Sequence, residues 1–292
     1  MPGLVDSLKS RLKLWLLSID QSPALQAVGR ALGRLSVQTL SAEEAKWVES
    51  IEALRREVYH SEAEIVKVDF GAGGAEDVRA KDEMDAGVDT RGKVGEIARL
   101  TSKRPFWAGM LFRLVRELRP ATCIEMGTSV GLSACYQAAA LACNGTGKLV
   151  TLEGDPTVAD IARANLAKIK LDRVEVVVGR FSDTLDKVLR DLQSVDYVFV
   201  DGHHDEVATV EYWQQMKPFL ADSALVIFDD IGWSPGMRRA WDRLCQDPNF
   251  VLAIDLDGVG VCVYTKQPRK QRHFWFSIKE SEAAWNQRFP LP

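Results

Sequence analysis

The sequence predicts an α/β fold whose core is a doubly wound, mostly parallel sheet of seven strands. Three observations predict it. Short apolar segments alternate with helical segments through the central part of the chain, the order expected of βα units with parallel strands. One apolar run ends at Glu125 and is followed by two glycines and an alanine-rich stretch, which indicates a strand, a tight loop and a helix. Two apolar runs near the C-terminus flank Asp257-Gly258, a hairpin signal that adds antiparallel strands at the end of the sheet.

The main domain is expected at residues 94–266, followed by a tail at 267–292. Its strands are expected at 121–125, 147–152, 174–178, 195–200, 224–228, 251–255 and 259–264. Its helices are expected at 106–118, 134–143, 157–170, 183–192, 206–219 and 237–245. The tail combines basic residues with the aromatic run 274–276, which we expect to pack back on the domain.

The composition is that of a globular protein with a full core, because 46% of the 292 residues are hydrophobic. A formal net charge of −4 gives no field that attracts nucleic acid, so no nucleic-acid partner is expected. No transmembrane segment or signal peptide is recognisable in the sequence. Five cysteines without close Cys-x-x-Cys spacing indicate reduced thiols rather than disulfides or a zinc site. We therefore expect a cytoplasmic protein.

Residues 1–93 are expected to form a helical extension and a loop. An apolar stripe at helical spacing lies near the N-terminus, with lysine and arginine between its members. It consists of Leu4, Leu8, Leu12, Trp15 and Ile19. We expect this stripe to dock on the main domain or on a second subunit, so a homodimer through the N-terminal helices is one expectation; a membrane surface is the alternative. A capping box at Ser41-Ala-Glu-Glu44 predicts a further helix, which reaches about His60.

A short strand is expected at 64–69, before the glycine-rich stretch 71–74 and a charged segment at 75–93. No Lys-Ser or Lys-Thr follows the glycines, which disfavours a phosphate-binding loop. The charged segment is therefore interpreted as an exposed loop. A flexible connector is favoured, and a lid over a ligand site is the alternative.

Acidic residues stand at the ends of four successive predicted strands. They are Glu125, Glu153, Asp201 and the pair Asp229-Asp230. Ligands of open α/β sheets bind beyond the carboxyl ends of the strands, and four acidic ends exceed what helix capping explains. Glu153 follows the glycine loop by about twenty residues, where a carboxylate can accept hydrogen bonds from both ribose hydroxyls.

The glycine loop has the pattern Glu-x-Gly-x-x-x-Gly, which differs from the Gly-x-Gly-x-x-Gly of dinucleotide-binding proteins. A carboxylate beside such a loop suits a cationic ligand better than a pyrophosphate. An NAD-dependent oxidoreductase is therefore disfavoured.

Together these motifs resemble those of the class I S-adenosylmethionine-dependent methyltransferases. The sequence is most similar to small O-methyltransferases related to catechol O-methyltransferase, in a bacterial branch with an Asp-Gly-His-His motif. The resemblance covers residues 94–266 and rests on five motifs in order. They are Glu125-Met-Gly-Thr-Ser-Val-Gly131, Leu152-Glu153, Gly179-Arg-Phe-Ser-Asp183, Asp201-Gly-His-His204 and Asp229-Asp230.

The resemblance implies S-adenosylmethionine as cofactor, with the glycine loop at its methionine part, Glu153 at its ribose and Ser182 or Asp183 near its adenine. The implied cofactor residues are Glu125, Gly127, Thr128, Ser129, Gly131, Ser133, Glu153, Gly179, Ser182, Asp183 and Asp201. It also implies a magnesium site of three oxygen donors, which would lower the pKa of an acceptor hydroxyl. The implied metal ligands are Asp201, Asp229 and Asp230, and the implied catalytic residues are His204 and Asp201.

Two residues depart from the pattern of the metal-dependent relatives. Those relatives usually carry asparagine where this chain has Asp230, and a lysine base where this chain has His204. A histidine can serve as general base, since its ordinary pKa is about 6.5. In the alternative, His203 and His204 are loop residues bonded to nearby carboxylates, and the acidic pair caps the following helix. A metal requirement and the identity of the base therefore stay open.

The resulting hypothesis is a methyltransferase that moves the sulfonium methyl group to an oxygen of a small-molecule acceptor by in-line displacement. An N- or C-methyltransferase of the same fold is the nearest alternative, although no Asn/Asp-Pro-Pro-Tyr run is present. An alternative of another class is a catalytically idle module that binds S-adenosylmethionine and a partner protein.

Overall fold

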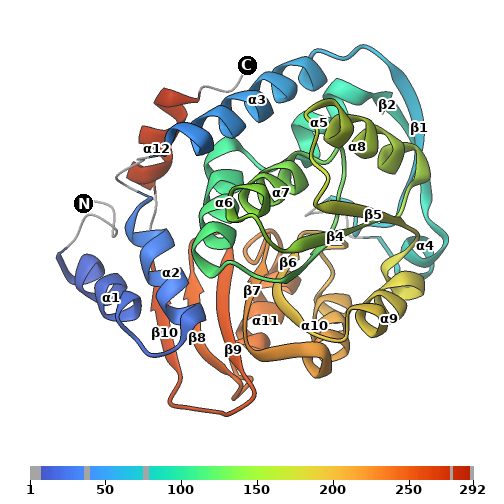
Figure 1. The fold of residues 1–292 in the computed structure, drawn as a ribbon. Helices are drawn as coiled ribbons and strands as arrows, with labels where there is room; N and C mark the ends of the chain where they lie inside the picture. Colours follow the sequence, from blue (N-terminus) through green and yellow to red (C-terminus); the bar gives the residue numbers. More distant parts are fainter. Residues whose placement is uncertain (1–7, 36–39, 75–78, 277–278, 290–292) are drawn as a thin grey trace.

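A computed structural model describes residues 8–35, 40–74, 79–276 and 279–289. Its centre is an eight-stranded sheet in the order β10-β8-β9-β7-β6-β3-β4-β5 (Figure 1). The strands are β3 (Thr122–Met126), β4 (Lys148–Glu153), β5 (Val174–Val178), β6 (Val195–Val200), β7 (Leu220–Phe228), β8 (Phe250–Asp255), β9 (Gly260–Thr265) and β10 (Arg272–Trp275). Strands β3 to β7 are parallel, and β9 is antiparallel to both β7 and β8. The predicted α/β fold with its terminal hairpin is confirmed.

The sheet has one strand more than predicted. The tail contributes β10, which pairs in parallel with β8 at the edge of the sheet. Phe276 follows β10 and is fully buried, while Trp275 is 53% exposed. The expectation that this aromatic run packs back on the domain therefore holds for Phe276. A strand of four residues is too short for its alternation to be recognised in the sequence.

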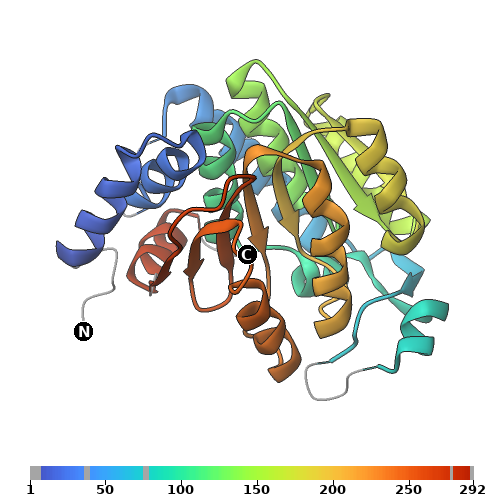
Figure 2. The ribbon, with the colours of Figure 1, turned by 90° about the horizontal axis from the view of Figure 1, so that it is seen from below.

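Helices cover both faces of the sheet, as Figure 2 shows from below. They are α5 (Val94–Thr101), α6 (Pro105–Leu118), α7 (Leu132–Asn144), α8 (Pro156–Lys168), α9 (Phe181–Leu192), α10 (Glu206–Met216) and α11 (Pro235–Leu244), with α12 (Lys279–Arg288) in the tail. One apolar core lies beneath α6 and α7, and a second lies beneath α9, α10 and α11. Among the described residues, no helix combines the length and the apolar character that a membrane span requires.

The N-terminal helices α1 (Leu8–Ser18), α2 (Pro23–Gly33) and α3 (Ala42–Tyr59) extend the first core. The capping box before α3 is confirmed, because Ser41 Oγ accepts from the Glu44 amide at 3.2 Å and the Glu44 carboxylate accepts from the Ser41 amide at 2.9 Å. Helix α2 packs on α6, and α3 packs on α7. These contacts join the N-terminal helices to the sheet layer.

The α1 stripe predicted to dock does not pack on the main domain, and its docking on a second subunit stays a prediction. Leu12, Trp15 and Ile19 are each more than half exposed, whereas Leu14 and Leu17 are buried. Helix α2 decides this, because a side chain at Gly29 would come within 2.4 Å of the α1 backbone. The two helices therefore cross closely, and the α1 residues at this crossing are buried. The apolar residues on the other face of α1 stay exposed although they have helical spacing. Leu4 lies outside the described residues.

The charged segment predicted to be a loop forms regular structure where it is described. Strand β1 (Glu64–Asp69) pairs antiparallel with β2 (Val88–Lys93), and α4 (Lys81–Ala86) lies between them. The sequence of β2, Val-Asp-Thr-Arg-Gly-Lys, lacks apolar alternation because neither of its faces is buried. Its strand conformation comes from backbone pairing, which a sequence pattern does not reveal.

A buried ion pair ties α3 to the sheet layer. The Arg55 guanidinium bonds both carboxylate oxygens of Glu52, at 2.9 and 3.1 Å, and neither side chain is more than 4% exposed. The Tyr136 hydroxyl on α7 donates to the same Glu52 carboxylate at 2.8 Å. Because buried charges require partners, these three side chains depend on one another.

We expect Glu52→Ala to lower the free energy of unfolding by about 3–5 kcal/mol, since it leaves the Arg55 guanidinium buried without its partner. Tyr136→Phe removes one hydrogen bond to a charged group and is expected to cost about 1.5–3 kcal/mol. Urea denaturation of both variants checks this. A Glu52→Ala loss no larger than the Tyr136→Phe loss would contradict the assignment of Arg55 as a dependent buried charge.

Candidate active site

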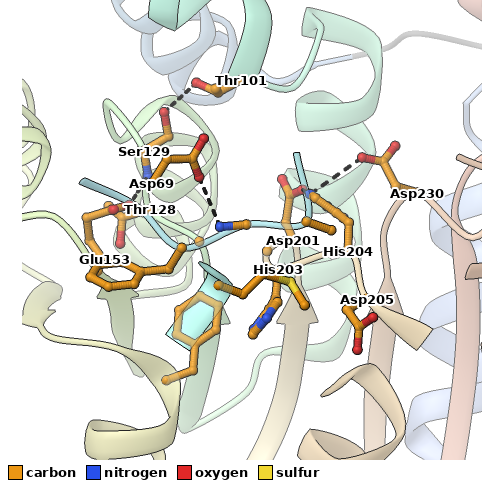
Figure 3. A pocket seen from close by; sticks show the side chains of 18 of the residues that line it. Asp69, Thr101, Thr128, Ser129, Glu153, Asp201, His203, His204, Asp205 and Asp230 are labelled. Atoms are coloured by element: carbon orange, nitrogen blue, oxygen red, sulfur yellow. Dashed lines mark hydrogen bonds and ion pairs between the residues drawn. The ribbon is translucent and has the colours of Figure 1, made fainter. Parts of the chain in front are cut away.

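A pocket of about 1090 Å³ opens at the carboxyl ends of β3, β4 and β6. Figure 3 shows side chains from the strand ends, from the β3–α7 loop and from Asp69 at the end of β1, and the segment that follows β1 also lines the pocket. That segment is held in place because the Ala72 amide donates to the His203 carbonyl at 2.8 Å. Arg79 also donates to the Gly71 carbonyl at 3.0 Å. Residues within 67–73 and 79–85 therefore form a wall of the pocket.

The β3–α7 loop is shaped by two glycines. Gly127 has φ +101°, and a Cβ there would lie 1.9 Å from the Asp201 carbonyl oxygen. Gly131 has φ +86° and precedes the first residue of α7. Between them, the Ser129 amide donates to the Glu153 carboxylate at 2.8 Å, and the Ser129 hydroxyl meets Thr101 at 2.6 Å. Of this loop and the start of α7, Gly127, Thr128, Ser129 and Ser133 line the pocket.

Glu153 lies below this loop and lines the pocket. One of its carboxylate oxygens accepts from the Ser129 amide, and the other accepts from the Asp155 amide at 3.1 Å. Burial raises the pKa of Glu153, although both hydrogen bonds oppose this shift. The carboxylate is thus fixed at the end of β4, facing the cavity.

Glu125 lies behind the pocket rather than in its wall. It is fully buried, and its carboxylate accepts from Gln137 and from Thr151, both at 2.6 Å. The Thr151 hydroxyl also meets the hydroxyl of Thr128 at 2.6 Å, and Thr128 lines the pocket. Burial raises the pKa of Glu125 to about 7. Glu125 therefore acts on the loop through two threonines, whereas the resemblance put it against the ligand itself.

The motif after β5 is divided. Ser182 lines the pocket, whereas the Asp183 carboxylate pairs with Arg180 at 2.7 Å near the surface. Gly179, with φ +136°, donates its amide to the Glu153 carbonyl at 2.8 Å. The structure thus brings Ser182 toward the cavity, and Gly179 supports the strand end behind it.

Asp201, His204 and Asp230 come together at the other side of the pocket, and a nitrogen or oxygen of each lies within 4.8 Å of the others. The His204 Nε2 atom is 3.6 Å from the Asp230 carboxylate and 3.9 Å from that of Asp201 (Figure 3). Burial raises the pKa of Asp201, against the opposing pull of Lys103 and His204. Trp233 lies beside the His204 ring, with 5.8 Å between the ring centroids.

His203 and His204 differ in their surroundings, although both have left-handed backbones at φ +72° and +51°. His203 Nδ1 bonds the hydroxyl of Tyr212 at 2.6 Å, and burial lowers the pKa of His203. His204 instead faces carboxylates across the cavity. Of the two, His204 is the one positioned to exchange a proton with a bound molecule.

The three carboxylates expected to hold magnesium do not converge as a free donor set. Asp229 is 2% exposed, and its carboxylate forms an ion pair with the Lys103 ammonium. The same ammonium lies 3.9 Å from Asp201. The group that does converge includes an imidazole nitrogen, whereas Mg²⁺ prefers oxygen ligands. The residues present therefore do not fit the expected magnesium site.

Sequence reasoning missed Lys103, which lies between α5 and α6 and lines the pocket. It stands before the central strand rather than at a strand end, so the rule that identified the carboxylates does not reach it. Two residues of α11 near this side of the pocket are otherwise engaged: Trp241 is buried against Gly260, and Arg238 pairs with Asp255 at 2.6 Å.

One side of the pocket therefore holds Glu153 beneath the glycine loop, and the other side holds the charged side chains of Asp201, His204 and Asp230. Residues 124–231 match a family described as a methyltransferase domain. This stretch contains the glycine loop, the acidic strand ends and the Asp-Gly-His-His motif. The resemblance predicted from the sequence is thereby confirmed.

Two curated relatives are similar to part of the chain. A catechol O-methyltransferase from Niastella koreensis is 29% identical over 126 residues, which are 42% of this chain and 55% of that protein. A catechol O-methyltransferase from Mycobacterium tuberculosis is 35% identical over 109 residues, 37% of this chain and 47% of that protein. The chain thus spans about half the length of the curated relatives it matches.

Solved structures share the fold. The O-methyltransferase from Bacillus cereus in complex with SAH has a TM-score of 0.50 at 24% identity, over 58% of this chain and 89% of that one. The SAH-bound Podospora anserina methyltransferase PaMTH1 has a TM-score of 0.52 at 16% identity, over 83% of this chain and 96% of that one. Because both identities are below 25%, these structures support the fold assignment alone.

The raised pKa of Glu125 predicts a pH-dependent stability. The folded protein holds this proton with a pKa of about 7, against the ordinary value of 4.5. The stabilisation by the proton is therefore complete below the unfolded pKa and is lost as pH rises toward 7, by about 3 kcal/mol in total. We expect the free energy of unfolding of the wild type to fall over this range relative to Glu125→Gln, as measured by urea denaturation. A difference between the two proteins that does not vary with pH would show that Glu125 is not held protonated.

Proposed function

We propose that the protein is an S-adenosylmethionine-dependent methyltransferase that acts on an oxygen of a small-molecule acceptor. The observation that carries this proposal is the position of Glu153, fixed beneath the β3–α7 loop at the edge of the pocket in a methyltransferase domain. The similar methyltransferases from Bacillus cereus and Podospora anserina are bound to SAH, and the curated relatives are named catechol O-methyltransferases. These names support both the cofactor and the oxygen acceptor.

In this proposal the cofactor lies along the glycine loop. The Glu153 carboxylate accepts from the ribose hydroxyls, and its present bonds to two backbone amides keep it oriented for that task. The methionine part lies beside Thr128, Ser129 and Ser133, and the adenine lies toward Ser182. Asp201 would lie beside the sulfonium, whose positive charge its carboxylate suits.

The acceptor lies between the sulfonium and His204, near Trp233. In the transfer, the acceptor hydroxyl gives its proton to His204 Nε2 and its oxygen forms a bond to the methyl carbon. The carbon–sulfur bond breaks, and its electron pair stays on sulfur, which becomes the neutral thioether of SAH. Asp201 and Asp230 stabilise the resulting imidazolium of His204, from which the proton leaves to solvent. Alignment of the two reactants in one pocket supplies much of the rate.

Location and assembly belong to the same proposal. The five cysteines are free, which fits the reduced environment of the cytoplasm. A homodimer through the N-terminal helices stays a prediction, as does the absence of a nucleic-acid partner. An idle binding module would bind the cofactor without turnover, so the two experiments below separate it from an enzyme.

We expect Glu153→Ala to weaken binding of SAH about 10- to 100-fold, because it removes a charged hydrogen-bond acceptor. Isothermal titration calorimetry of the purified protein measures this. Asp160→Ala is the matched control, since that carboxylate pairs with Arg163 on the exposed side of α8. If the wild type fails to bind SAH, the proposed cofactor is wrong.

We expect His204→Asn to lower turnover about 10²- to 10⁴-fold while SAH binding is retained, because the general base is lost. Formation of SAH from SAM with catechol as the acceptor probe measures the rate. Asparagine is chosen because it tolerates the left-handed backbone at this position. His203→Asn carries the same backbone requirement and is expected to lose much less activity. Equal losses in the two variants would contradict the role given to His204.

A further inference from the structure

We propose that Lys103 is the resident cation of this site, and that its ammonium takes the place between Asp201 and Asp229 that a divalent metal would need. The inference rests on the proposed methyl transfer and adds that the reaction proceeds with this ammonium instead of a metal ion. Lys103 thereby becomes a further residue of the acceptor pocket, outside the segment that matches the methyltransferase family.

The geometry of Lys103 is that of a buried ion cluster. Its side chain is 16% exposed, and its ammonium is paired with the Asp229 carboxylate, which is 1% exposed. Asp201, with a side chain 10% exposed, lies 3.9 Å away. Two carboxylates this deeply buried require a cation, because burial penalises their charged forms. Lys103 supplies that charge from the protein itself.

The position of Lys103 is fixed by the ends of two helices. Immediately before it, the Ser102 amide bonds the Ala98 carbonyl at 3.0 Å as α5 ends. Immediately after it, the Arg104 carbonyl accepts from Ala108 at 3.0 Å as α6 begins. Thr101 in addition binds the Ser129 hydroxyl of the cofactor loop. The backbone of Lys103 is therefore fixed on both sides by helix ends, as the carboxylates that it faces are fixed by strand ends.

A divalent metal at Asp201 and Asp229 would have to displace the ammonium or lie beside it. If the metal displaced the ammonium, both carboxylates would be free to bind it, but their ion pairs with Lys103 would be lost. Coexistence puts a dication next to a monocation, which is unfavourable at such short range. Lys103 therefore competes directly with the metal for the same oxygen atoms.

An ammonium has three donors, and one of them is taken by Asp229. Because Lys103 lines the pocket, another is available to an acceptor oxygen beside Asp201. That hydrogen bond becomes stronger as the oxygen loses its proton to His204, so it stabilises the developing negative charge. Acceptors with an acidic hydroxyl, such as phenols, gain most from this arrangement.

The test measures metal binding and cofactor binding separately. Mn²⁺ serves as the metal probe, followed by electron paramagnetic resonance with and without SAH, and calorimetry measures SAH binding. The variants are Lys103→Met, which keeps the length without the charge, and Lys103→Arg, which restores a cation. Lys81→Met is the matched control, since it changes another lysine of the pocket wall on α4.

We expect no Mn²⁺ binding by the wild type at millimolar metal, and turnover of catechol that is unchanged by EDTA. Lys103→Met is expected to bind Mn²⁺ at least about tenfold more tightly, because two carboxylates are freed. Lys103→Arg and Lys81→Met are expected to behave as the wild type toward Mn²⁺. Tight Mn²⁺ binding by the wild type, loss of turnover in EDTA, or no gain of Mn²⁺ affinity in Lys103→Met would each overturn the inference. Failure of SAH binding in the calorimetric titration of the wild type would instead overturn the proposed function, because Mn²⁺ binding to the carboxylates is titrated separately, with and without SAH.

Discussion

The pocket depends on one close contact between two backbones, where the end of β3 meets Asp201, the residue that follows β6. The Asp201 amide donates to the Met126 carbonyl at 2.8 Å, and the Gly127 amide donates to the Leu152 carbonyl at 3.0 Å. Three parallel strands are thus joined at one point. A side chain at Gly127 would occupy the position of the Asp201 carbonyl, so only glycine allows this junction. Around it, the ends of β4 and β6 place Glu153 and Asp201 on the same cavity.

This junction explains why the sequence was sufficient to predict half of the site. Parallel strands present their carboxyl ends at one edge of the sheet, so acidic residues that follow different strands meet there without further information. Glu153, Asp201, His204 and Asp230 all line the pocket for this reason. The strands themselves were predictable because they are buried on both faces and appear as continuous apolar runs.

The errors arise where position depends on contacts between distant segments. Glu125 is the last but one residue of β3 and shares a sheet face with Cys123, so it points under α7 to Gln137 rather than into the cavity. Asp229 is likewise turned away, to Lys103. Successive side chains of a strand point to opposite faces, so a shift of one residue decides which of two neighbouring acidic residues faces the pocket. The end of a strand cannot be predicted from the sequence to one residue. Lys103, β2 and the buried face of α1 depend on partners that no local pattern indicates.

The two sides of the pocket have different origins in the chain. The side beneath the glycine loop is built within residues 124–231, the stretch shared with the methyltransferase family. Part of the opposite walls comes from the end of β1 and the segment after it, from the loop that carries Lys103, and from Trp233. All of these lie outside that stretch. A cofactor pocket must keep its shape because the cofactor is constant, whereas the acceptor walls are free to change. On the proposed function, these walls take part in recognising the acceptor, and two of them are anchored to residues 124–231 by the Ala72–His203 and Thr101–Ser129 bonds.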